Sequence, residues 1–160
     1  MLSRGFAPRT SAFAERRAET DYTLRAEKTV ESAKCRVQNV FSMKHQNLQN
    51  RTHRFALAVI KFTEELPHDD TSRTIGRQLL RSGTSVGANY RAVCRAKSKA
   101  DFISKMGTVL EEADESAFWI ELLVDAAKAD AQHAQPLLAE ANELIAIAAS
   151  SINTARRNGD

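Results

Sequence analysis

The segment RSGTSVGANYR, residues 81–91, decides how the chain folds. It carries two glycines four residues apart, so it is either a loop that cradles a phosphate or a helix that lets another helix approach closely. A phosphate loop needs a preceding strand and a closing Lys-Ser/Thr pair, and neither is present. On a helical wheel, Gly76, Gly83, Gly87 and Cys94 share one narrow sector. The segment therefore predicts a helix with a seam of small residues for close packing.

The sequence before this segment predicts another helix. Phe55, Val59, Phe62 and Leu66 recur at the spacing of a helix that buries one face, and Pro67 ends the pattern. The side chains of residues 69–72 can then cap the glycine-containing helix, which we expect to run to about residue 96.

The sequence after the segment predicts two further helices. Ser98 can cap a helix over about 99–128, with an apolar stripe that ends at Val124. The stretch ADAQHAQP closes it, and a last helix is expected over about 135–157. Because the connections are short and no β-type alternation occurs, residues 51–157 predict an all-α, antiparallel four-helix bundle.

Composition limits the possible classes of protein. At 160 residues the chain has room for one domain with a core, and it contains no apolar run long enough to span a membrane. The N-terminus lacks the apolar region of a signal peptide, and two cysteines, Cys35 and Cys94, do not make a disulfide framework. We expect a cytoplasmic protein with free thiols.

The N-terminal region differs from the rest of the sequence. Residues 1–42 carry eight Lys or Arg against five acids and few large apolar side chains. This composition predicts a disordered basic extension. Alternatively, translation begins at Met43, since the patterns of a folded domain all follow it.

A stripe of cations runs along the second predicted helix, within a sector of about 80° at 100° per residue. We call it the basic stripe; it consists of Arg73, Arg77, Arg81, Arg91, Arg95 and Lys99. Either these side chains contact the phosphate backbone of a nucleic acid, or they pair with acids of the third helix and face water. Exposed aromatic residues are not interleaved with them, so stacking on single-stranded bases is not supported.

The third predicted helix carries the opposite charge and a broad apolar surface. Its acids Glu111, Glu112, Asp114 and Glu115 avoid the main apolar stripe, so we expect no metal site. Four large apolar residues lie largely off that stripe and widen the apolar surface beyond one core face. They predict a subunit interface formed by Phe118, Trp119, Leu122 and Leu123.

Residues 78–123, QLLRSGTSVGANYRAVCRAKSKADFISKMGTVLEEADESAFWIELL, resemble the bacterial four-helix-bundle proteins that are encoded in intervening sequences of 23S rRNA genes. Residues 54–67, RFALAVIKFTEELP, look like the family's first helix. The resemblance covers roughly 51–157. One departure is that many members read Ala-Asn-x-x-Glu-Gly where this chain has Ala-Asn-Tyr-Arg-Ala-Val at 88–93.

The resemblance implies a bundle that assembles into a ring of five. It also implies a relation to the accessory protein of diversity-generating retroelements, a pentamer that works with a reverse transcriptase and binds nucleic acid through a basic surface. Carried over to this chain, the contact positions would be Arg73, Arg77, Arg81, Arg91, Arg95, Lys97 and Lys99.

Two functions from different classes compete. The first is a non-enzymatic homo-oligomer, most simply a pentamer, that binds structured RNA or DNA through the basic stripe. The second is an assembly adaptor that holds a protein partner without binding nucleic acid. No nucleophile–base pair, metal set or phosphate loop supports an enzyme, and no cofactor is expected.

Overall fold

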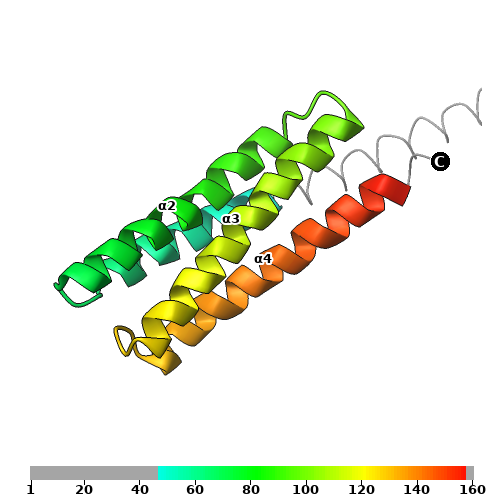
Figure 1. The fold of residues 1–160 in the computed structure, drawn as a ribbon. Coiled ribbons are helices and arrows are strands. Elements are labelled where there is room, and N and C mark those ends of the chain that lie inside the picture. Colours follow the sequence, from blue (N-terminus) through cyan, green and yellow to red (C-terminus); the bar gives the residue numbers. More distant parts are fainter. Residues whose placement is uncertain (1–46, 158–160) are drawn as a thin grey trace, which may run out of the picture. The chain divides into compact units, whose positions relative to one another are not determined.

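The computed structural model describes residues 47–157, and four helices account for most of them. The first helix occupies residues 47–64, α2 spans Asp70–Val93, α3 spans Lys99–Asp125 and α4 spans Ala131–Arg157 (Figure 1). No strand occurs within 47–157. The all-α prediction is confirmed. The expectations for residues 1–42 lie outside the described residues.

The helices form a four-helix bundle in which neighbours in sequence pack together. α2 packs against α3, and α3 packs against α4. The first helix packs against α2 through the glycines and against α4 through Arg51, which donates two hydrogen bonds to Glu140 at 2.6 and 2.9 Å. His133 at the start of α4 lies 2.7 Å from Glu65 at the end of the first helix, so these two helices are antiparallel.

The core contains the apolar stripes that the sequence predicts. Phe55, Val59, Phe62 and Leu66 are all buried, and α2 adds Leu79, Val86, Tyr90 and Val93. α3 and α4 contribute their own buried stripes, including Met106, Ile120, Ala141, Leu144 and Ala148. Their burial supplies the apolar area that stabilises the bundle.

The glycines face the first helix, as the seam prediction requires. A Cβ atom added to Gly83 would lie 2.7 Å from Cγ2 of Val59, and one added to Gly76 would lie 3.0 Å from the Leu66 side chain. At Gly87 the nearest atom would be the backbone oxygen of Thr52, at 3.3 Å. The seam of Gly76, Gly83 and Gly87 therefore allows the first helix to approach α2 closely. Cys94 does not share this position, because it is exposed at the C-terminal cap of α2.

The ends of α2 and α3 follow capping chemistry. Asp69 caps α2 by accepting hydrogen bonds from the backbone N–H and the hydroxyl of Ser72, at 3.0 and 2.8 Å. These bonds, together with one from Lys128, hold the pKa of Asp69 well below its usual range. Ser98 caps α3 by accepting from the backbone N–H of Asp101. α3 ends at Asp125, before the expected residue 128, because Ala127 adopts a left-handed conformation with φ of 53°.

The start of α4 differs from the prediction of a helix beginning near residue 135. It begins at Ala131, and the Asp130 side chain accepts a hydrogen bond from the backbone N–H of His133 at 2.9 Å. Pro136 therefore lies in the second turn of the helix rather than at its start. It has no N–H to offer the carbonyl of Gln132, a loss that the capped first turn and the buried Ala134 and Leu137 offset.

We expect Gly83→Ala to lower the free energy of unfolding by about 1–3 kcal/mol, because the added methyl meets Val59, whose branched side chain has one favoured rotamer in a helix. Gly107→Ala on α3 is the matched control. Its Cβ would meet nothing within 4 Å, so it should raise the free energy of unfolding by about 0.5–1 kcal/mol. Urea denaturation of both variants measures the difference, and equal stabilisation by both would contradict the close approach.

Candidate nucleic-acid interface

The basic stripe lies on the side of α2 that faces solvent. Arg73, Arg77, Arg81, Arg91 and Arg95 are all exposed, whereas Tyr90 between them is buried in the core. Contrary to the prediction, the stripe does not lie on one helix throughout, because α2 ends at Val93 rather than near residue 96. Arg95 and Lys97 follow that end, Lys99 is the first residue of α3, and all three are exposed. The helix positions the stripe because its other two sides are occupied by the first helix and by α3.

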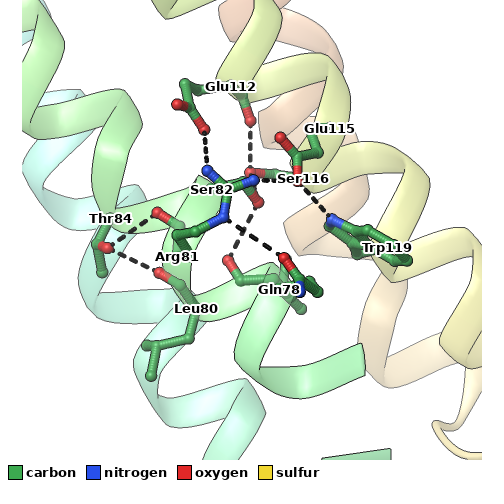
Figure 2. A network of polar contacts seen from close by, with 10 residues as sticks. Gln78, Leu80, Arg81, Ser82, Thr84, Glu112, Glu115, Ser116 and Trp119 are labelled. Carbon is green, nitrogen blue, oxygen red and sulfur yellow. Dashed lines mark hydrogen bonds and ion pairs between the residues drawn. The ribbon is translucent and has the colours of Figure 1, made fainter. Parts of the chain in front are cut away.

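Arg81 differs from the other arginines because it pairs with α3 (Figure 2). Its guanidinium donates a hydrogen bond to a carboxylate oxygen of Glu115, and its Nη1 lies 3.8 Å from Oε2 of Glu112. The Glu115 carboxylate also accepts from the indole N–H of Trp119 at 3.0 Å. At this position the alternative interpretation of the stripe, pairing with acids of the third helix, is confirmed.

A buried polar contact joins α2 and α3 next to this ion pair. The hydroxyl oxygens of Ser82 on α2 and Ser116 on α3 lie 3.0 Å apart, and both side chains are buried (Figure 2). The Ser116 hydroxyl also bonds to the backbone oxygen of Glu112 at 2.7 Å. Two small hydroxyls allow α2 and α3 to pack closely while their polar groups remain paired.

The two carboxylates beside Arg81 have opposite pKa shifts. Hydrogen bonds from Trp119 and Arg81 lower the pKa of Glu115. Burial raises the pKa of Glu112, although the charge of Arg81 partly offsets this effect. Oε2 of Glu112 is buried without a hydrogen bond, because 3.8 Å from Arg81 is too long for one. In this network the Glu112 carboxylate therefore lacks a hydrogen bond at one oxygen, whereas the Glu115 carboxylate accepts hydrogen bonds from both Arg81 and Trp119.

The remaining cations fall into two groups. Arg73 lies near Asp70 and donates to the backbone oxygen of His68, and Lys99 donates to the backbone oxygen of Arg156 at 3.1 Å. By contrast, Arg77, Arg91 and Arg95 have no ion pair or side-chain hydrogen bond within residues 47–157. We call these three the open arginines. They are the positive charges of α2 and of the turn that follows it that the described fold does not neutralise.

The predicted subunit interface on α3 is only partly available at the surface. Phe118 is 52% exposed and packs edge-on against Trp119, with ring centroids 4.8 Å apart. Trp119 and Leu122 are half-buried. The prediction is wrong for Leu123, which is completely buried in the core. The reason is that α3 packs against both α2 and α4, so it needs apolar residues on more than one face.

Among the described residues, no group of three or more His, Cys, Asp or Glu side chains is placed to hold a metal ion. The same part of the chain contains no helix that is long and apolar enough to cross a bilayer.

The sequence and the fold can be compared with known proteins. The family model described as 23S rRNA-intervening sequence protein matches residues 44–150, which is more than half of the chain. The chain belongs to this family. The resemblance noted from the sequence is thereby confirmed.

A solved structure supports the family's fold in this chain. It is a protein of unknown function from the S23 ribosomal protein family of Bacteroides thetaiotaomicron, with 30% sequence identity and a TM-score of 0.64. The similarity covers 69% of this chain and 98% of that chain. No curated protein matches the sequence.

Sequence reasoning missed the polar network between α2 and α3. The signal was available in part, because Ser82 precedes the seam glycine and Ser116 lies within the apolar stripe of α3, where a polar residue needs a partner. The pairing of Arg81 could not be read in the same way. Its position on the wheel differs from that of Arg77 by only about 40°, less than half of the 100° between consecutive residues.

We expect Glu112→Gln and Glu115→Gln to change stability in opposite directions at pH 7. Glu112→Gln removes a carboxylate whose ionisation burial opposes, so it should raise the melting temperature. Glu115→Gln removes a carboxylate stabilised by Trp119 and Arg81, so it should lower the free energy of unfolding by about 1 kcal/mol.

Both differences should shrink toward pH 3. Glu112 is then protonated in the folded and unfolded states alike, and the contribution of Glu115 is lost as the pH falls through its lowered folded pKa. Melting curves between pH 3 and 7 test this. A destabilising Glu112→Gln at neutral pH would contradict the assignment.

Proposed function

We propose that this protein is a non-enzymatic, oligomeric four-helix bundle that binds structured RNA or DNA through the basic stripe of α2. The observation that carries the proposal is the state of the open arginines. Arg77, Arg91 and Arg95 are exposed, and the described part of the chain supplies none of them with an ion pair or side-chain hydrogen bond. Their natural partner is therefore an anion from outside that part of the chain.

The geometry of α2 suits a phosphate backbone. At a rise of 1.5 Å per residue, Arg77 and Arg91 are separated by roughly 21 Å along the helix, so they can reach phosphates well apart on a nucleic acid. Between them lie two small residues, the half-buried Thr84 and the exposed Ala88. Glu115 is paired with Arg81, and Glu112 lies 3.8 Å from the same guanidinium, so the positive charge of Arg81 offsets their repulsion of a phosphate.

A structured nucleic acid fits this surface better than an unpaired strand. Binding to single strands relies on aromatic side chains that stack on bases. The one aromatic residue of α2, Tyr90, is 1% exposed and belongs to the core. Guanidinium groups on a rigid helix instead favour contact with phosphates whose positions are fixed by base pairing.

Oligomerisation would multiply this contact. Three arginines per subunit give weak binding, but several copies on one assembly, five in the pentamer that the resemblance implies, would act together on one nucleic acid. The exposed Phe118 is the observation that favours association, because an aromatic ring at the surface is stabilised by burial. The same ring supports the alternative function, an adaptor that holds a protein partner.

We expect the triple variant Arg77→Gln, Arg91→Gln, Arg95→Gln to lose most of its affinity for a structured RNA or DNA. The slope of log affinity against log salt should fall by about one for each phosphate contact removed. The variant with lysine at the same three positions is the matched control, and it should retain the slope because it retains the charge. Titration at several salt concentrations measures both, after light scattering confirms an unchanged mass.

Arg81→Gln separates binding from stability. Because Arg81 already pairs with Glu115, its loss should lower the melting temperature and change the salt slope less than Arg91→Gln does. Unchanged nucleic-acid affinity in the triple glutamine variant would remove the binding hypothesis and leave the adaptor function.

A further inference from the structure

Two exposed stripes on opposite sides of the bundle match each other in charge and spacing. On the first helix, Leu57 is 45% exposed and lies between Arg54 and Lys61, which are exposed as well. On α3, Phe118 is 52% exposed and lies between Asp114 and Glu121, also exposed. Leu57 and Phe118 are two of the three large hydrophobic residues that the described chain exposes.

The four charged side chains that flank Leu57 and Phe118 are unpaired within the described residues. Arg54, Lys61, Asp114 and Glu121 have no ion pair or side-chain hydrogen bond within residues 47–157. Each triplet lies within a sector of about 60° on its own helix, so each forms one continuous strip. One strip is apolar at its centre and positive at both ends, and the other is apolar at its centre and negative at both ends.

The spacing of the two strips matches in one orientation. From Arg54, the positions run to Leu57 after three residues and to Lys61 after seven. From Glu121, counted backwards, they run to Phe118 after three residues and to Asp114 after seven. An antiparallel pair of helices therefore brings Leu57 onto Phe118 and each cation onto an acid, over roughly 10 Å of helix.

We infer that the first-helix strip (Arg54, Leu57, Lys61) of one molecule binds the α3 strip (Asp114, Phe118, Glu121) of a second copy. A second copy is the partner because this chain carries both complementary strips in the required register. One turn further along, the register would place Glu64 opposite Glu111. This repulsion limits the contact to about two turns. The two antiparallel helices therefore cross at an angle, so that their axes diverge beyond the strips.

The positions of the strips determine the kind of assembly. The first helix and α3 each pack against α2 and α4, so they occupy diagonal corners of the bundle and expose their strips in opposite directions. A molecule can then bind one neighbour through each strip. Such a head-to-tail contact repeats from copy to copy and produces a closed ring or an open chain, not a two-fold dimer.

The inference rests on the oligomeric part of the proposed function and adds the surfaces that form the contact. It leaves the open arginines outside the contact, because they lie on α2 and in the turn that follows it, whereas the strips lie on the first helix and on α3. The same assembly can therefore bind a nucleic acid along α2 while its copies are joined through the first helix and α3.

The test is a charge reversal on each strip, followed by sedimentation velocity of the full chain. Arg54→Glu with Lys61→Glu, and separately Asp114→Lys with Glu121→Lys, should each reduce the oligomer to smaller species whose helical content, measured by circular dichroism, equals that of the wild type. Mixing the two variants should restore association, because each retains one native strip that fits the other. All four substitutions in one chain should restore the oligomer. Wild-type mass in either reversed variant, or no association in the mixture, overturns the inference.

The apolar centre has its own test. Phe118→Ala should raise the dissociation constant of the oligomer by about tenfold or more, the effect of truncating a central aromatic contact. Leu80→Ala is the matched control, since Leu80 is exposed on α2 outside both strips, and it should leave the constant unchanged. An equal effect of the two truncations contradicts the assignment of the contact.

Failure of this inference can be distinguished from failure of the proposed function. If the reversed variants dissociate and reassociate as expected while the triple glutamine variant still binds nucleic acid normally, the contact is correct and nucleic-acid binding through α2 is wrong. If the reversed variants keep the wild-type mass while the triple glutamine variant loses binding, the contact is wrong and the binding surface stands.

Discussion

The close approach of the first helix to α2 at Gly83 is the constraint on which the rest of the structure depends. Val59 occupies the space that a side chain at position 83 would need, and Gly76 and Gly87 give the same freedom to Leu66 and to the backbone of Thr52. Glycine inside a helix costs about 1 kcal/mol against alanine, so the seam is retained at a measurable expense in helix stability. The contacts that it permits fix the rotation of α2 about its own axis.

That rotation determines which charges remain available. With one side of α2 against the first helix and Ser82 against Ser116 of α3, the third side has to face solvent, and the basic stripe lies there. Arg81 pairs with Glu115 of α3, whereas Arg77, Arg91 and Arg95 form no ion pair within residues 47–157. The packing of small residues thus produces a charged surface that the side chains of residues 47–157 do not neutralise.

Much of this arrangement could be predicted from the sequence, because it depends on periodicity. The buried stripe of Phe55, Val59 and Phe62, the glycine seam and the exposure of the stripe all follow from the spacing of 3.6 residues per turn. The partner of Arg81 depends on how α2 and α3 are rotated against each other, which spacing does not determine. The burial of Leu123 could not be predicted, because apolar residues on more than one face of a helix fit either a subunit contact or packing against two neighbouring helices. In this fold α3 packs against both α2 and α4, and Leu123 is buried.

The fold holds Arg81 in an ion pair with Glu115 and, under the proposed function, leaves the open arginines available for phosphates. Side-chain NMR of arginine Nε–Hε groups during titration of the full chain with a structured RNA tests this most directly, because each guanidinium reports separately. We expect the signals of Arg77, Arg91 and Arg95 to shift with the bound fraction while the signal of Arg81 stays at its position in the free protein. Binding that moves Arg81 as strongly as these three, or that leaves all of them unmoved, would contradict this expectation.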